Sequence, residues 1–220
     1  LGAEDTGELA VDRIQQDLGK VHQAAKHLLA LINDILDLSK VEAGKMDLHL
    51  ESFDVGELID EVIDTVRPLS EQNANQIHQL QQMPYELVAD RTKLKQVLLN
   101  LTGNAVKFTE SGAITLRVRH LPAHARFHAA LRPSSPPGAN GWIGIAVHDT
   151  GVGIPEEQIQ VIFEEFVRGP RTAKDAPGTG LGLAISSHLA RLLGGDLRAE
   201  SDPGRSSTFM LFIPCPAPAG

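Results

Sequence analysis

Cysteine is nearly absent from this chain, in which Cys215 is the single one among 220 residues. One thiol cannot form a disulfide within the chain, and it cannot build a zinc site from several cysteines. We therefore expect a reducing compartment, the cytoplasm. A chain of 220 residues is long enough to bury a sizeable hydrophobic core without disulfides.

Positive charge and long apolar runs are also scarce. The chain carries 20 lysine and arginine residues against 28 aspartate and glutamate residues, a formal net charge of -8. This balance argues against nucleic-acid binding and against binding to anionic membranes. Asn33 and Asp34 interrupt the most apolar run, so it predicts neither a membrane span nor a signal peptide. If a longer parent protein is membrane-anchored, we expect the anchor outside this stretch.

A long amphipathic helix is predicted near the N-terminus. Its apolar residues recur at intervals of four and three, which is a heptad seam that needs a partner helix in water. The seam consists of Ile14, Leu18, Val21, Ala25, Leu28, Ile32 and Ile35. We expect residues 1–45 to be the C-terminal helix of an antiparallel hairpin that dimerises into a bundle. The other helix would precede residue 1. The alternative is a long helix packed on its own domain.

Residues 46–214 read as one domain of mixed strands and helices. Alternating or apolar runs predict strands at 46–51, 76–82, 86–89, 112–120, 142–148, 196–201 and 207–213. Capping residues and helical periodicity predict helices that follow Asp54 and Asp90, and further helices at 156–163 and 181–193. The proline-rich stretch 121–141 predicts a mobile insertion, residues 168–177 a flexible lid, and residues 215–220 a disordered tail.

The helix after Asp90 carries an unusual polar stripe. Asn100, Asn104 and Lys107 follow one another at spacings of four and three, which places them at the rim of the apolar face. Most such stripes are solvated. Asparagine is a poor helix former, however, while an amide oxygen suits Mg²⁺ and a lysine suits phosphate. The stripe alone leaves both interpretations open.

Two glycine-rich segments suggest a ligand. One, residues 149–155, begins with Asp149 directly after an apolar strand, and the other, residues 178–183, opens a helix. Glycines allow close approach of the backbone, and the N–H groups at a helix N-terminus bind phosphate. An acidic hydrogen-bond acceptor at one end and a phosphate site at the other indicate a purine nucleotide between them.

Four segments in this order resemble the sensor histidine kinases of two-component systems. Residues 90–109 look like their N-box, residues 149–155 their first glycine box, residues 163–166 their F-box and residues 178–183 their second glycine box. The resemblance implies an α/β two-layer sandwich, with a mixed sheet and helices on one face, of the type shared with gyrase and chaperone ATPases. It implies ATP and Mg²⁺ as cofactors.

Carried over by position, the resemblance assigns residues to the adenine side of the nucleotide. Asp149 would accept a hydrogen bond from the adenine amino group, and Phe108 would lie against the ring. Gly151 and Gly153 would let the chain pass the base. Thr208 would support the adenine through a water molecule.

The same resemblance assigns the phosphate side. Asn104 would ligate Mg²⁺ with Asn100 beside it, and Lys107 would touch phosphate. The lid hinge and further phosphate contacts would come from Gly178, Thr179, Gly180, Leu181 and Gly182.

The chain departs from the family in one respect. It has no H-box, the segment that carries the phosphoacceptor histidine, and His22 and His27 lack the neighbours of that motif. We expect an ATP-binding catalytic part that positions Mg-ATP for transfer to a histidine outside this chain. The partners implied are the missing phosphoacceptor helix, a receiver domain of a response regulator and, for the full protein, a second copy.

Two other classes stay open. One is an ATPase of the gyrase and chaperone type, whose asparagine helix carries a water-activating glutamate; residues 94–107 contain none. The other is a non-catalytic module that binds a nucleotide or a partner.

Overall fold

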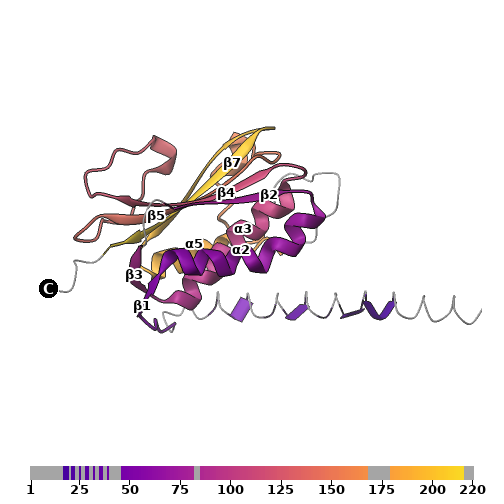
Figure 1. The fold of residues 1–220 in the computed structure, drawn as a ribbon, viewed down its shortest axis with the longest axis horizontal. Coiled ribbons are helices and arrows are strands. Elements are labelled where there is room, and N and C mark those ends of the chain that lie inside the picture. The colour runs from indigo at the N-terminus through magenta and orange to yellow at the C-terminus, as the bar shows by residue number, and fades with distance from the viewer. Residues whose placement is uncertain are drawn as a thin grey trace, which may run out of the picture.

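The computed structural model describes residues 46–81, 85–167 and 179–215, together with twelve helical positions between residues 17 and 39. The predicted lid at 168–177, Gly178, His27 and residues 216–220 lie outside the described residues. The main body has two layers, a five-stranded sheet and a layer of helices below it (Figure 1). This is the α/β sandwich that the motifs indicate.

The sheet is mixed. Its strands are β2 (Gln76–Gln81), β4 (Ala113–Leu121), β5 (Trp142–Asp149), β7 (Ser206–Pro214) and β6 (Asp196–Asp202), in the spatial order β2-β4-β5-β7-β6. β2 pairs with β4 in parallel, and the other neighbours are antiparallel. β5 therefore lies in the middle of the sheet. Asp149, its last residue, stands at the end of this central strand.

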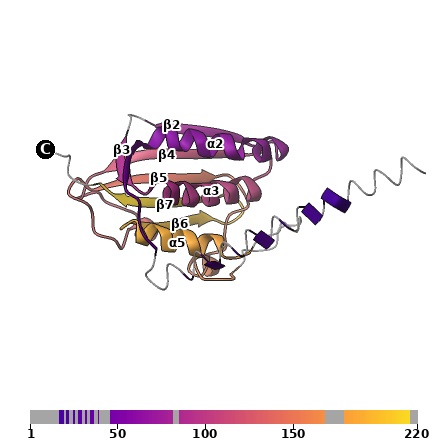
Figure 2. The same cartoon turned by 90° about the horizontal axis from the view of Figure 1, so that it is seen from below.

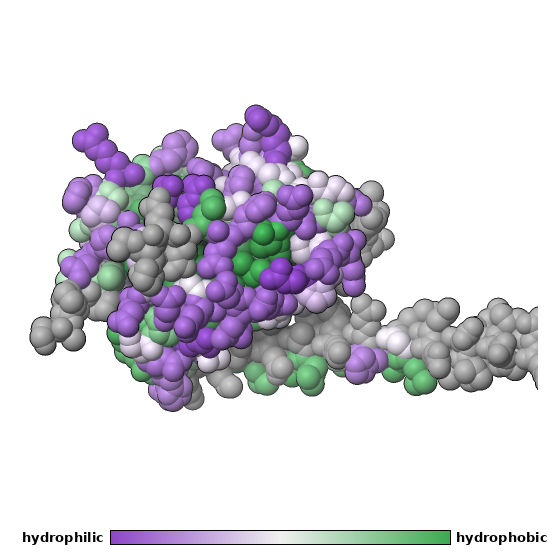
Figure 3. Space-filling view, viewed as in Figure 1, coloured by the Kyte–Doolittle hydropathy of each residue, from purple (hydrophilic) through white to green (hydrophobic). Residues whose placement is uncertain are grey.

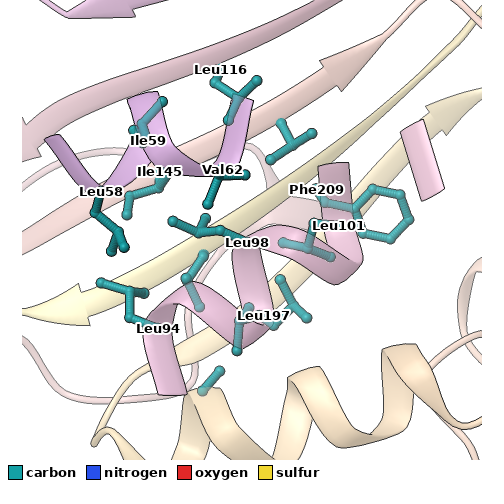
Figure 4. Packing of buried hydrophobic residues seen from close by; sticks show 14 of the residues in the cluster. Leu58, Ile59, Val62, Leu94, Leu98, Leu101, Leu116, Ile145, Leu197 and Phe209 are labelled. Atoms are coloured by element: carbon teal, nitrogen blue, oxygen red, sulfur yellow. The ribbon is translucent and has the colours of Figure 1, made fainter. Parts of the chain in front are cut away.

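Three helices cover one face of the sheet. They are α2 (Val55–Gln72), α3 (Arg91–Phe108) and α5 (Gly182–Leu192), and they lie side by side with α3 between the other two (Figure 2). The core between helices and sheet is apolar and buried, and Figure 4 shows side chains of both layers packed together in it. It includes Leu58, Ile59, Val62, Leu94, Leu98, Leu101, Leu116, Ile145, Leu197 and Phe209. Burying each such side chain contributes about 1.5–3 kcal/mol before the entropy of folding is counted.

Aspartates begin the first two of these helices, as the sequence predicts. Asp54 Oδ1 accepts hydrogen bonds from the backbone N–H groups of Gly56 and Glu57. Asp90 Oδ1 accepts from Lys93 N at 2.9 Å, and its other oxygen accepts from His49 N at 3.0 Å. Asp90 is buried. Its two hydrogen bonds tie the chain that enters the domain to the first turn of α3.

The C-terminal end of α3 is held by a buried amide. Asn75 Nδ2 donates to the carbonyl oxygens of Val106 and Thr109, and Asn75 Oδ1 accepts from Gly112 N. These bonds satisfy carbonyls that the helix itself leaves without a partner at its end. They also fix the turn that leads from α3 to β4.

Several sequence-based boundaries need correction. The first strand, β1, is Glu51–Asp54 rather than 46–51, and it pairs with β3 (Glu86–Ala89) in a separate two-stranded sheet. The predicted strands at 76–82 and 86–89 therefore belong to different sheets. The helix predicted at 156–163 is shorter, because α4 covers only Glu156–Ile159 and hydrogen-bonded turns follow.

The insertion at 121–141, expected to be mobile, packs on the sheet face opposite the helices (Figure 1). The ring of Phe127 stands edge-on to Trp142 and Phe212, with centroids 5.7 Å and 5.4 Å away. Ser134 N donates to Asp196 Oδ2 at 2.6 Å. The insertion's own helical turn is η1 (Ala129–Leu131), a 3₁₀ turn. Aromatic contacts and hydrogen bonds thus anchor this segment.

The described positions between residues 17 and 39 are all helical and all exposed. Leu18, Val21 and Leu28 of the predicted seam are 62%, 65% and 58% exposed, and apolar side chains are visible along this helix in Figure 3. None of the helices in the described part of the chain is long and apolar enough to cross a membrane.

Replacing Asp90 should destabilise the fold. We expect Asp90→Ala to lower the free energy of unfolding by about 2 kcal/mol, because it removes a helix cap and leaves His49 N without an acceptor. Asp90→Asn keeps one acceptor oxygen and should cost about half as much. Urea unfolding at neutral pH measures both, and wild-type stability of Asp90→Ala would contradict the assignment.

The loss of stability caused by Asp90→Ala should also depend on pH. Burial raises the pKa of Asp90, but the N–H groups of His49 and Lys93 outweigh burial, so its pKa in the folded protein is lowered. A lowered folded-state pKa gives stability that is present above the unfolded pKa and lost as pH falls through the folded one. The difference between wild type and Asp90→Ala should therefore shrink in acid.

Candidate nucleotide site

Helix α3 touches both glycine-rich segments. At its C-terminal end, Val152 N donates to the carbonyl oxygen of Phe108 at 3.3 Å. Two turns earlier, Asn100 Nδ2 donates to Ser186 Oγ of α5 at 2.8 Å. Asn104 lies between these two contacts on the same helix face. The structure thus brings the predicted stripe, the loop after β5 and the first turns of α5 together.

Asp149 is a buried carboxylate at the end of β5, only 4% exposed. Its Oδ1 accepts a hydrogen bond from Gly151 N at 2.9 Å. Burial raises the pKa of this carboxyl above its ordinary value, and the N–H groups of Gly151 and Ser207 offset only part of that effect. The hydroxyl of Thr109 also faces Asp149, although it makes no full hydrogen bond within the described residues. A buried carboxylate with spare acceptor capacity suits a ligand N–H group.

The two glycines of the first segment are required by the protein's own backbone. A Cβ on Gly151 would lie 2.3 Å from the carbonyl oxygen of Phe108. Gly153 has φ +67°, and a Cβ there would lie 2.4 Å from the carbonyl oxygen of Asp202. Both glycines therefore let this loop pack tightly against α3 and against the β6–β7 turn.

Thr208 is not part of the site, contrary to the sequence-based assignment. In the antiparallel pair β5–β7, Thr208 stands opposite His148 and its hydroxyl lies 3.0 Å from His148 Nδ1. Asp149 stands opposite Ser207, which points to the helix-covered face. Successive strand residues face opposite sides of a sheet, so a shift of one residue exchanges the two faces. Ser207, which is buried, occupies the place that was assigned to Thr208.

The two asparagines of α3 differ in their surroundings. Asn104 is half-buried, and no described residue bonds to its side-chain amide. Asn100, by contrast, is engaged with α5 through Ser186. Within the described residues no group of three His, Cys, Asp or Glu side chains could hold a metal. An oxygen-preferring cation at this site could use the amide oxygen of Asn104 together with oxygens of a ligand.

Lys107 and Phe108 lie at the C-terminal end of the stripe. Lys107 Nζ lies 5.2 Å from the centroid of the Phe108 ring, a distance at which a cation is attracted to an aromatic face. Both side chains are half-buried. They lie at the rim of the core, as the helical spacing predicts, with a positive charge and a ring at the same edge.

The second glycine segment leads directly into α5. Leu181 N donates to Thr179 Oγ1 at 3.0 Å, while the Leu181 side chain is fully buried. Gly180 has φ +74°, and a Cβ there would lie 2.9 Å from the carbonyl carbon of Phe166. Gly182 begins the helix. Any contact of Leu181 with a ligand would thus be made by its backbone.

Within the described residues, a hollow of about 610 Å³ lies apart from Asp149 and Asn104. It is on the side of α5 away from α3, and its walls include Phe163, Ser187, His188 and Arg198. The segment at 168–178 lies outside the described residues. The site is therefore defined by its contacts and not by an enclosed cavity.

Sequence reasoning did not identify three polar residues around the site. Ser186 and Thr109 are 1% exposed and Ser207 is 5% exposed. Strand alternation could have identified Ser207, because it shares its parity with the core residues Phe209 and Leu211. For Ser186 the helical position relative to Gly182, four residues earlier, was the available signal.

Comparison with known proteins identifies the family of this chain. The family model of histidine kinase-, DNA gyrase B- and HSP90-like ATPases matches residues 89–217. Sensor protein GacS of Pseudomonas syringae pv. syringae is 34% identical over 202 residues, which are 90% of this chain and 21% of GacS. The circadian input-output histidine kinase CikA of Synechococcus elongatus is 36% identical over 92% of this chain and 25% of CikA. The chain thus spans about a fifth to a quarter of these relatives.

A solved structure shows a similar fold. The crystal structure of full-length ShkA in complex with AMPPNP superposes with a TM-score of 0.74 at 28% identity, over 94% of this chain and 40% of that chain.

Because Asp149 is buried, we expect its charged carboxyl to lower the stability of the ligand-free protein. A carboxyl whose folded-state pKa is raised loses stability as pH rises through that pKa, because the fold disfavours the charged form. We expect Asp149→Asn to unfold at an equal or higher temperature than wild type at neutral pH. The difference should vanish in acid, where the wild-type carboxyl is protonated. Calorimetric melting of the ligand-free protein checks this, and a large loss of stability at neutral pH would contradict it.

Proposed function

Because the chain belongs to the family of histidine kinase-, DNA gyrase B- and HSP90-like ATPases, we propose that it positions Mg-ATP for transfer of the γ-phosphoryl group to a histidine. It is the ATP-binding catalytic module of a sensor histidine kinase. The observation that carries the proposal is the arrangement of a buried carboxylate, Asp149 at the end of β5, and an amide on α3, Asn104, to which no described residue bonds, around one helix that contacts both glycine-rich segments.

Recognition of the base would depend on Asp149. A buried, ionised carboxylate accepts a hydrogen bond from the adenine amino group, whereas the carbonyl of guanine at that position would be repelled. Burial raises the pKa of Asp149, and the N–H groups of Gly151 and Ser207 offset part of that effect. Phe108 would pack against the base, and Ser207 replaces Thr208 as the hydroxyl beside the carboxylate.

The phosphates would lie toward α5. The backbone of residues 179–182 enters the helix there, and its N–H groups favour negative charge. Lys107 would add a positive charge at the same edge. Phosphoryl transfer needs mainly positioning and charge neutralisation, and these residues supply both without a nucleophile of their own.

Mg²⁺ would be held by the amide oxygen of Asn104 together with phosphate oxygens. The residues fit this role, since Asn104 is half-buried and no described residue bonds to its amide. A hard cation with oxygen ligands is what an isolated amide and phosphates select. The cation would neutralise phosphate charge.

The partners follow from the relatives. GacS is a sensor protein and CikA a histidine kinase, and we extend to this chain a phosphoacceptor histidine on a separate helix, a receiver domain as the next acceptor, and a homodimeric, cytoplasmic parent protein. The exposed seam of the N-terminal helix supports the homodimer.

Substitution of Asp149 should remove nucleotide binding. We expect Asp149→Asn to weaken Mg-ATP at least tenfold in titration calorimetry, because one good hydrogen bond to a charged group contributes about 1.5–3 kcal/mol. The matched control is Asp202→Asn, an exposed aspartate whose partner is Arg205. Wild-type affinity for Asp149→Asn, or equal losses in both variants, would contradict the proposed site.

The isolated chain should neither turn over ATP rapidly nor label itself. No glutamate lies in residues 94–107 to activate water, and no H-box supplies an acceptor. Incubation with γ-labelled Mg-ATP should therefore release phosphate at the rate of a protein-free blank. Rapid steady hydrolysis would favour the gyrase and chaperone type of ATPase instead, and acid-labile label on this chain would show an acceptor that the sequence does not reveal.

A further inference from the structure

The side chain of Asn100 spans the first turn of α5. Its Nδ2 donates to Ser186 Oγ at 2.8 Å. Its other end faces Gly182, where a Cβ would lie 2.4 Å from Asn100 Oδ1 and 3.0 Å from Asn100 Cγ. Gly182 and Ser186 are four residues apart and therefore lie on the same face of the helix. The glycine makes room for the amide, and the serine gives it a partner.

Ser186 is specifically placed for this contact. It is 1% exposed, so its hydroxyl is removed from water at the junction of α3 and α5. Its neighbour Ser187 is also buried, at 4% exposed, but faces the hollow on the other side of α5. Two adjacent buried serines thus have different surroundings, and only the first meets the polar stripe of α3.

The α3–α5 contact sets the distance between two parts of the nucleotide site. Asn104 is one turn from Asn100 on α3, and the segment 179–182 runs directly into the first turn of α5. A cation that shares oxygens between Asn104 and the phosphates requires both helices at one separation. Binding of the nucleotide without the cation depends less on that separation, because the phosphates then contact the start of α5 and the long, flexible side chain of Lys107.

We propose that Ser186 is a positioning residue of the Mg-ATP site: its hydroxyl holds Asn100 against α5, so that Asn100 locks the two helices together and Asn104 alone is presented to the cation. This inference rests on the proposed function and adds to it a division of labour between the two asparagines. Asn100 acts through Ser186, and Asn104 touches the cation.

The test is a double-mutant cycle with Ser186→Ala and Asn100→Ala, read as ATP affinity by titration calorimetry in Mg²⁺ and in EDTA. We expect Ser186→Ala to weaken Mg-ATP about tenfold and to change Mg-free ATP less than twofold. The double variant should be no weaker than Asn100→Ala alone, because both changes break the same contact. Melting of the ligand-free variants separates a binding effect from a loss of folding.

Ser187→Ala is the matched control, since it removes a buried hydroxyl from the same helix turn, and it should bind Mg-ATP as wild type does. If wild type binds Mg-ATP but Ser186→Ala behaves as Ser187→Ala, the inference is wrong while the proposed function stands. Equal losses with and without Mg²⁺, or additive effects in the double variant, would also overturn it. If wild type itself fails to bind, the proposed function is wrong.

Discussion

The seating of α3 on the sheet is the constraint on which the rest of the molecule depends. One face of this helix is buried against the strands, so its rotation about its own axis is set by Leu94, Leu98 and Leu101. Its start is tied by Asp90 and its end by Asn75, both through hydrogen bonds of buried side chains. With rotation and both ends determined, the polar stripe at the rim has one possible orientation, toward the glycine-rich segments.

The chemistry at the two ends of the stripe differs because the surroundings differ. Asp149 lies where burial works against its charge, which makes it a strong acceptor for a ligand that brings its own N–H groups. At the other end, beside Asn100, the backbone N–H groups that open α5 favour negative charge. A molecule with a neutral hydrogen-bonding base at one end and a polyanionic tail at the other fits these two ends in one orientation only.

Much of this arrangement could be predicted from the sequence, because it follows from local periodicity and capping. The apolar arc of α3, the strand that delivers Asp149 and the caps Asp54 and Asp90 are of this kind. Pairing between distant strands could not be read from the sequence, so the sequence did not reveal that the strands at 76–82 and 86–89 belong to different sheets. Thr208 was misplaced by one position, a small error along the chain that exchanges the faces of a strand. The engagement of Asn100 with Ser186 depends on the packing of two helices and joins residues 86 positions apart in the chain, which no local pattern encodes.

The docking of the insertion also decides which parts of the outer sheet surface another macromolecule can reach. Phe127 and its neighbours occupy the area above Trp142 and Phe212, on the strands at the centre of the sheet and next to it. Arg117 and Arg119 on β4 and His78 on β2 remain exposed on the other half of that surface. The insertion thus covers one part of the outer sheet surface and leaves two arginines exposed on another part, in a protein whose formal net charge is -8.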